Sequence, residues 1–135
     1  MRGWHIYIDG ASLGNPGRSG AGIVGYDEEG NEVWREGIHL GTMTNNMAEY
    51  EALVRALRKA REMAVTIVSV YTDSELVAKQ VLGAYRAKND RLRKYLQEAK
   101  DLIDEFNGFE IKYISREKNK LADKLAKGAA LQQSG

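Results

Sequence analysis

Cysteine is absent from this chain of 135 residues, which excludes disulfide bonds, thiolate catalysis and cysteine-ligated metals. No apolar run approaches the roughly 20 residues that a membrane-spanning helix needs. The N-terminus also lacks the basic-then-apolar pattern of a secretory signal. We therefore expect a cytoplasmic protein that does not enter a membrane.

Neither sign of charge is in excess, because the formal net charge at pH 7 is only +1. The charges are nevertheless unevenly spread. Residues 1–52 carry three basic and eight acidic side chains, whereas residues 79–100 carry seven basic and two acidic ones. Such a basic stretch is typical of a surface that binds a polyanion, and equally of a solvated helix face.

Apolar periodicity divides the chain into strands and helices. Runs rich in β-branched and aromatic residues predict five strands, at residues 4–8, 20–26, 32–40, 65–71 and 109–115. Helical spacing predicts four helices, at residues 44–63, 74–82, 92–106 and 119–131, with Asn119 as the N-cap of the last. Three strands followed by alternation indicate an α/β domain with a mixed sheet flanked by helices. We expect residues 1–130 to form one domain and residues 131–135 a flexible tail.

Four carboxylates stand at the ends of these elements. Asp9 ends the first predicted strand and Asp73 the fourth, while Glu49 and Asp123 lie in the first turns of two helices. If the first and fourth strands are parallel neighbours, Asp9 and Asp73 emerge at one edge of the sheet, where open α/β sheets bind ligands. Glu49 shares a helix face with the apolar Leu53, so its carboxylate needs a counter-charge or a shifted pKa.

Each acid also has a local explanation. Glu49 has capping-box spacing from Asn46, and Asp73 could cap the helix that follows it. Asp9 could open a turn, and Asp123 could complement a helix dipole. If all four converge, however, mutual repulsion is tolerable only when divalent cations hold them. Oxygen ligands without histidine or thiolate select Mg²⁺ or Mn²⁺, and two such ions can clamp a phosphodiester.

Four segments resemble the signature segments of the type-1 ribonuclease H family. They are YIDGASLGNPG at residues 7–17, TNNMAEYEAL at 44–53, YTDSELV at 71–77 and REKNKLADKLA at 116–126. The resemblance implies a ribonuclease H-like fold, with three antiparallel strands and then two parallel ones. It also implies an endonuclease that cuts the RNA strand of RNA–DNA hybrids and leaves 5′-phosphate and 3′-hydroxyl ends.

The resemblance also assigns site residues. It makes Asp9, Glu49, Asp73 and Asp123 the catalytic acids, which bind two Mg²⁺ ions, with Mn²⁺ as an alternative. The residues expected to contact the hybrid are Gly10, Ser12, Gly14, Asn15, Thr44, Asn45, Asn46, Ser74, Tyr85, Lys88 and Arg116. The glycine loop 10–14 is expected to sense the RNA strand, because backbone without side chains can approach a 2′-hydroxyl. Helix capping is the alternative for the two asparagines before Met47.

The chain departs from the family pattern in three places. The basic insertion that many bacterial members carry is absent between residues 81 and 92, and Tyr85, Arg86 and Lys88 are expected to replace it in part. Packing at a helix end is the alternative for Tyr85. The loop before Asp123 has no histidine, and Glu75 stands where many members have glutamine, which puts a base contact in doubt.

Three other functions share parts of this pattern. A non-catalytic nucleic-acid-binding module would gain only phosphate repulsion from four acids. Other nucleases of the superfamily share the acids but not the segments around residues 13–17 and 44–53. A related ATPase would need a second lobe. We expect a free-standing monomer that needs no protein partner.

Overall fold

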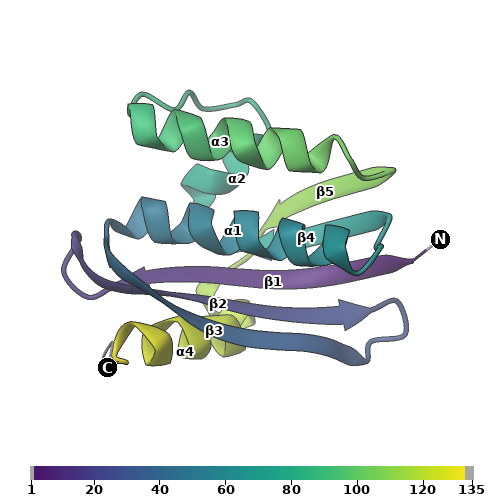
Figure 1. Cartoon of the computed structure of the whole chain (residues 1–135), viewed down its shortest axis with the longest axis horizontal. Helices are drawn as coiled ribbons and strands as arrows, with labels where there is room; N and C mark the ends of the chain where they lie inside the picture. The colour runs from purple at the N-terminus through teal and green to yellow at the C-terminus, as the bar shows by residue number, and fades with distance from the viewer. Residues whose placement is uncertain (1, 133–135) are drawn as a thin grey trace.

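A five-stranded mixed sheet forms the centre of the computed structural model, which describes residues 2–132 (Figure 1). Its strands are β1 (Gly3–Ser12), β2 (Gly17–Asp27), β3 (Glu32–Met43), β4 (Ile67–Thr72) and β5 (Gly108–Tyr113). They are ordered β3-β2-β1-β4-β5, with antiparallel pairing among the first three and parallel pairing of β4 with β1 and β5. The predicted fold class and strand directions are confirmed.

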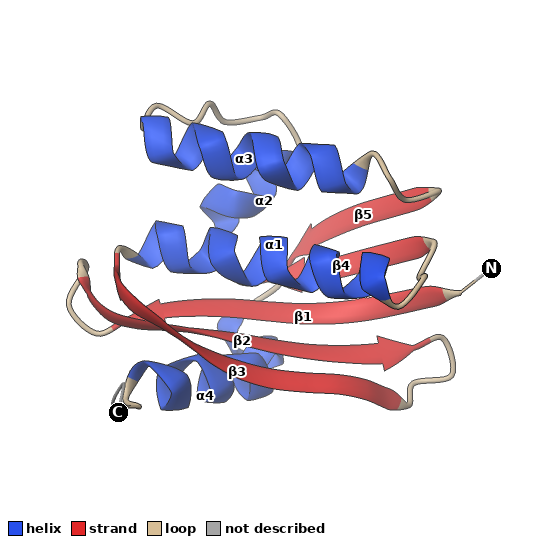
Figure 2. Cartoon of the chain, in the orientation of Figure 1, coloured by secondary structure: helices blue, strands red, loops and turns tan. Residues whose placement is uncertain are grey.

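Helices cover both faces of this sheet (Figure 2). They are α1 (Asn45–Glu62), α2 (Glu75–Val81), α3 (Asp90–Ile103) and α4 (Lys120–Ala130), which follows a 3₁₀ turn, η1 (Arg116–Asn119). In the view of Figure 2, α1 crosses in front of the sheet and α4 lies behind β2 and β3. Within residues 2–132, no helix combines the length and apolar character that crossing a membrane requires.

The main core lies between the sheet and α1. Tyr50, Leu53 and Leu57 are fully buried on one helix face, and they pack with Ile6 and Ile8 of β1. These helix positions repeat at three- and four-residue intervals, which is the spacing that predicted the helix. The same packing fixes which residues of α1 point at the sheet, including the buried Glu49.

Glycines on neighbouring strands let α1 and α4 approach the sheet closely. A Cβ on Gly10 of β1 would lie 2.2 Å from the backbone carbon of Ala48 in α1. A Cβ on Gly22 of β2 would lie 2.0 Å from the carbonyl oxygen of Ala122 in α4. Side chains alternate between faces along a strand, and Gly22 pairs with Asp9 rather than with Gly10. The two helices therefore press on opposite faces of the sheet at nearly the same point.

Two predicted boundaries that matter for the site are wrong. Strand β1 continues past Asp9 to Ser12, because Asp9, Gly10 and Ala11 keep their pairing with β2. The expected glycine loop 10–14 is therefore mostly strand. Helix α1 begins at residue 45 with Thr44 as its N-cap, which places Glu49 in the second turn and excludes the capping box.

The end of the chain is tied to the sheet as far as the structure describes it. The guanidinium group of Arg18 on β2 donates hydrogen bonds to the carbonyl oxygens of Leu131, at 2.6 Å, and Gln132, at 2.7 Å. The remaining residues of the predicted tail, 133–135, lie outside the described part. The extent of the domain thus stays a prediction.

Replacing Gly22 by alanine tests the close approach of α4. We expect Gly22→Ala to lower the free energy of unfolding by about 1–3 kcal/mol, because backbone of α4 must move to admit the methyl group. Gly25→Ala in the same strand is the control, since its Cβ would meet only atoms at 3.7 Å or more. Urea unfolding measures both. Equal stability of the two variants would contradict this account of the packing.

Candidate active site

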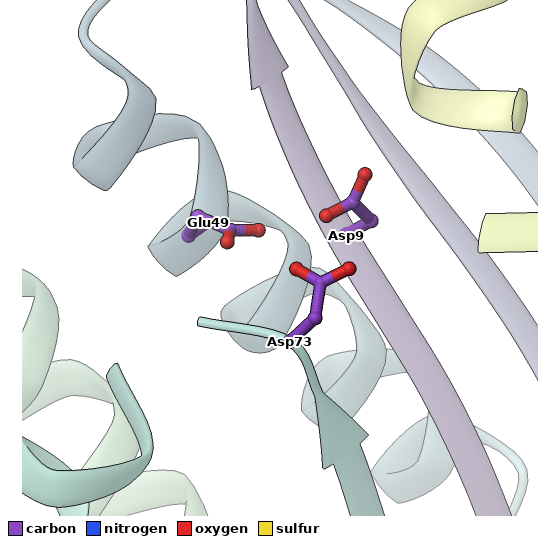
Figure 3. Close-up of side chains that lie close together, drawn as sticks. All are labelled: Asp9, Glu49 and Asp73. Atoms are coloured by element: carbon purple, nitrogen blue, oxygen red, sulfur yellow. The ribbon is translucent and has the colours of Figure 1, made fainter. Parts of the chain in front are cut away.

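Three of the four predicted acids meet where β4 stops pairing with β1. The last pair of the parallel ladder is Ile8 with Thr72, so Asp9 and Asp73 are the next residues on the two strands. The prediction that they emerge together is confirmed. Glu49 reaches them from α1, and Figure 3 shows the three carboxylates converging from three elements. Ligand oxygens of Asp9, Glu49 and Asp73 all lie within 4.8 Å of one another.

A main-chain hydrogen bond holds Glu49 in this cluster. Its Oε1 accepts from the N–H of Gly10, which lies beyond the end of the β1–β4 ladder. The close contact of Gly10 with α1 therefore has a second consequence: it brings the helix near enough for this bond. Glycine at position 10 serves the packing of α1, and its N–H is already engaged by a carboxylate.

Asp123 lies beside the cluster rather than within the group of three. It is in the first turn of α4, as predicted, and its carboxylate pairs with Lys127 at 3.1 Å. Hydrogen bonding to the Asp123 side chain, and then its charge, nevertheless contribute to the raised pKa of Asp9. Asp123 is thus the fourth acid at the site, and it approaches Asp9 from the α4 face of the sheet.

Burial and mutual repulsion raise the pKa of two of these acids. For Asp9, loss of solvation is the largest cause, and the charges of Glu49 and Asp73 raise the pKa further. For Glu49, burial again comes first and Asp73 adds to it, while the N–H of Gly10 and the charge of Arg116 act in the opposite direction. Without cations the site therefore retains protons that a bound metal would displace.

The expected RNA-sensing residues form one hydrogen-bonded network between the β1–β2 turn and α1. Asn45 Oδ1 accepts from the N–H of Ser12 at 2.8 Å, and the N–H of Asn45 donates to Asn15 Oδ1 at 2.9 Å. The hydroxyl of Ser12 accepts from the N–H of Asn15 at 3.0 Å. Gly14 lies in this turn, where a Cβ would approach the carbonyl oxygen of Pro16 to 2.9 Å. The network leaves the side chain of Asn46 exposed beside it.

Two further predicted contacts cap helices. Thr44 accepts from the N–H of Met47 at 3.2 Å and begins α1, so the capping alternative for the asparagines is wrong. Ser74 accepts from the N–H of Val77 at 3.2 Å and begins α2. Asp73 does not cap α2, which leaves its carboxylate for the acidic cluster.

The remaining predicted contacts lie on the α2–α3 connection and, for Arg116, on η1, from which its charge acts on Glu49. Tyr85 is 44% exposed, and the Lys79 ammonium group lies 5.0 Å from the centre of its ring. Lys88 and Arg116 are exposed. Glu75 pairs with Lys79 at 2.8 Å, and this lysine lowers the pKa of its carboxyl.

Arg93 and Gln80 fix the backbone of the α2–α3 connection. The Arg93 guanidinium donates to the carbonyls of Ala87 and Lys88, both at 2.9 Å. The buried Gln80 donates to the carbonyl of Arg86 at 3.3 Å. Side-chain hydrogen bonds therefore fix the backbone of residues 86–88, and we call this the braced α2–α3 connection. The amino-acid composition of this stretch did not predict these bonds.

Known proteins share this architecture. Residues 7–129 match the protein family described as "Reverse transcriptase-like". Ribonuclease HI of Halobacterium salinarum is 38% identical over 93% of this chain, which spans 63% of that protein's length. The putative hydrolase EbsB of Enterococcus faecalis is 37% identical, over 92% of this chain and 91% of its own length.

Solved structures agree with these sequence matches. The crystal structure of RNase H1 from Halobacterium salinarum superposes with a TM-score of 0.92, covering 94% of this chain and 96% of that one. LC11-RNase H1, isolated from compost, was solved in complex with an RNA/DNA hybrid. It has a TM-score of 0.89 and 36% identity, and the match covers 94% of this chain and 96% of that one.

The raised pKa values predict how stability depends on pH in the presence of a chelator. An acid whose pKa is higher in the folded state binds more protons there, so stability falls as pH rises above the ordinary carboxyl range. Asp9→Asn removes one of these charges. We expect the variant to gain about 1–3 kcal/mol over the unchanged chain at pH 8, and less at pH 5.

Urea unfolding at the two pH values measures this difference. Asp104→Asn, which changes an exposed acid at the end of α3, is the control and should leave the pH dependence unchanged. A chain that is destabilised by Asp9→Asn at pH 8 would contradict the assignment of repulsion to this site.

Proposed function

The chain belongs to the reverse transcriptase-like family, among the type-1 ribonucleases H, and we propose that it is an endonuclease that hydrolyses the RNA strand of RNA–DNA hybrids. The observation that carries the proposal is the convergence of Asp9, Glu49 and Asp73 at the end of the β1–β4 ladder. LC11-RNase H1, solved with an RNA/DNA hybrid, supports the choice of substrate. The products would carry 5′-phosphate and 3′-hydroxyl ends.

The donor set fits a hard divalent cation. Asp9, Glu49 and Asp73 offer carboxylate oxygens only, and two of these residues are buried, which suits Mg²⁺ or Mn²⁺ better than zinc. We propose that these three acids and Asp123 hold two ions. When bound, such ions lower the pKa of an attacking water and stabilise the departing 3′-oxygen. Asp9 lies on the central strand β1 between the other acids, so we propose that it would be the central ligand of the site.

The chain's own groups prepare this site. The N–H of Gly10 orients Glu49, and Arg116 supplies a positive charge near its carboxylate. We propose that Arg116 also contacts a phosphate. The network of Ser12, Asn15 and Asn45 would present Gly14 and Asn46 to the sugars and the minor-groove edge of the RNA strand.

The DNA strand would contact a separate set of residues. Thr44 and Ser74 begin two helices, and we propose that Thr44 contacts a DNA phosphate there. Tyr85 and Lys88 are exposed on the braced α2–α3 connection, where Tyr85 would stack on a sugar and Lys88 would contact the backbone. A monomer that acts in the cytoplasm without a protein partner stays a prediction.

Cleavage of labelled hybrid tests the proposal directly. We expect Mg²⁺-dependent cutting of the RNA strand, and a loss of more than about 100-fold in Asp9→Asn, because a lost metal ligand costs more than an outer-shell change. Asp123→Asn should lose less, since Asp123 lies outside the group of three. Asp104→Asn is the exposed control. Cutting of duplex DNA, or full activity of Asp9→Asn, would contradict the proposal.

Salt dependence of binding tests the α2–α3 connection. We expect Lys88→Ala to weaken hybrid binding at low salt and to reduce the slope of log affinity against log salt by about 1, as one lost phosphate contact should. Lys112→Ala is the control, because Lys112 lies on β5 and faces Glu110 at 3.6 Å. Fluorescence anisotropy with a catalytically inactive chain measures both. An unchanged slope in Lys88→Ala would remove Lys88 from the interface.

A further inference from the structure

Asn119 occupies the N-cap position of α4 without capping the helix. Its side chain makes no hydrogen bond to the N-terminal amides of α4, although asparagine is among the best capping residues. The residue is only 2% exposed. A buried amide that leaves its own helix uncapped is engaged elsewhere in the structure.

The Asn119 amide instead bridges the two strands at the acidic site. Its Nδ2 donates to the carbonyl oxygen of Ile8 at 2.8 Å and to Asp73 Oδ2 at 3.3 Å. Ile8 is the last residue of β1 that pairs with β4. Ile8 and Gly10 are two residues apart on an extended strand, so their polar groups face the same edge. Asn119 and Glu49 thus bind backbone groups of β1 at the end of the β1–β4 ladder and just beyond it.

The bridge reaches the carboxylate of Asp73. This residue lies between the end of β4 and Ser74, the N-cap of α2, and belongs to neither element. Among residues 2–132, the amide of Asn119 is the one side-chain donor to its carboxylate. Asn119 Oδ1 accepts no hydrogen bond from residues 2–132. The buried amide therefore interacts through its N–H donors alone.

We propose that Asn119 is a positioning residue for the metal site. One amide holds the Asp73 carboxylate at a fixed separation from the segment of β1 that carries Asp9. The same residue begins the helix that carries Asp123, so η1 sets the position of three acids together. The inference rests on the proposed metal-dependent function, and it predicts that metal affinity depends on a residue that need not touch the metal.

Calorimetric titration of Mn²⁺ without nucleic acid tests the inference. We expect Asn119→Ala to bind Mn²⁺ 10–100-fold more weakly than the unchanged chain, which is the usual cost of losing an outer-shell partner. Asn119 borders a cavity of about 460 Å³, so water can enter and satisfy the Ile8 carbonyl after truncation. In hybrid cleavage, kcat should fall while KM stays unchanged. Asn119→Ser keeps a shorter donor and should lose less affinity.

Gln80→Ala is the matched control. Gln80 is also a buried amide, 3% exposed, but it bonds the Tyr50 hydroxyl and the Arg86 carbonyl away from the acids. We expect it to lose stability and to keep its Mn²⁺ affinity within twofold. Unchanged affinity in folded Asn119→Ala, or in Asn119→Ser if the alanine variant does not fold, would overturn the inference. So would an equal loss in Gln80→Ala. Absence of Mn²⁺ binding in the unchanged chain would instead overturn the proposed function.

Discussion

The site depends on the early end of pairing between β1 and β4. The ladder stops at Ile8 and Thr72, while β1 continues to Ser12 along β2. This leaves backbone groups of β1 without a strand partner and opens a gap at the centre of the sheet. Glu49 of α1 and Asn119 of η1 bind backbone groups of β1 at this gap. The carboxylates of Asp9, Glu49 and Asp73 converge there (Figure 3). In a sheet that paired fully here, the N–H of Gly10 would bond to a strand partner rather than to Glu49.

Close packing of α1 and α4 on the sheet brings their acids to this gap. Gly10 admits the backbone of α1 on one face, and Gly22 admits α4 on the other. Both contacts set how far Glu49 and Asp123 stand from Asp9. The cost is a cluster of like charges in a poorly solvated place, which raises the pKa of two acids. Such a cluster is destabilising for a metal-free chain and favourable for one that binds cations.

Most of the fold and the choice of acids could be predicted from the sequence. Periodicity predicted five strands and four helices in the right order. The expectation that the first and fourth strands are parallel neighbours was enough to predict that Asp9 and Asp73 lie close together. The end of β1 could not be predicted, because glycine after Asp9 is as typical of a turn as of a close helix contact. The structure decides for the contact, since Gly10 keeps its pairing with β2. The position of Glu49 in the second turn of α1 was missed because the start of the helix was ambiguous. Thr44 is the N-cap, but the two asparagines that follow it are also residues that can cap a helix.

The sequence around Asn119 did not distinguish an N-cap from a residue that bonds elsewhere. An asparagine four residues before Asp123 is typical of an N-cap, and only the coordinates show that its amide turns to β1 and Asp73.

The most direct test of the whole account is a crystal soaked in Mn²⁺ and measured at the manganese absorption edge. The account predicts anomalous density bounded by Asp9, Glu49 and Asp73. Manganese bound only elsewhere on the molecule, with this site empty, would contradict it.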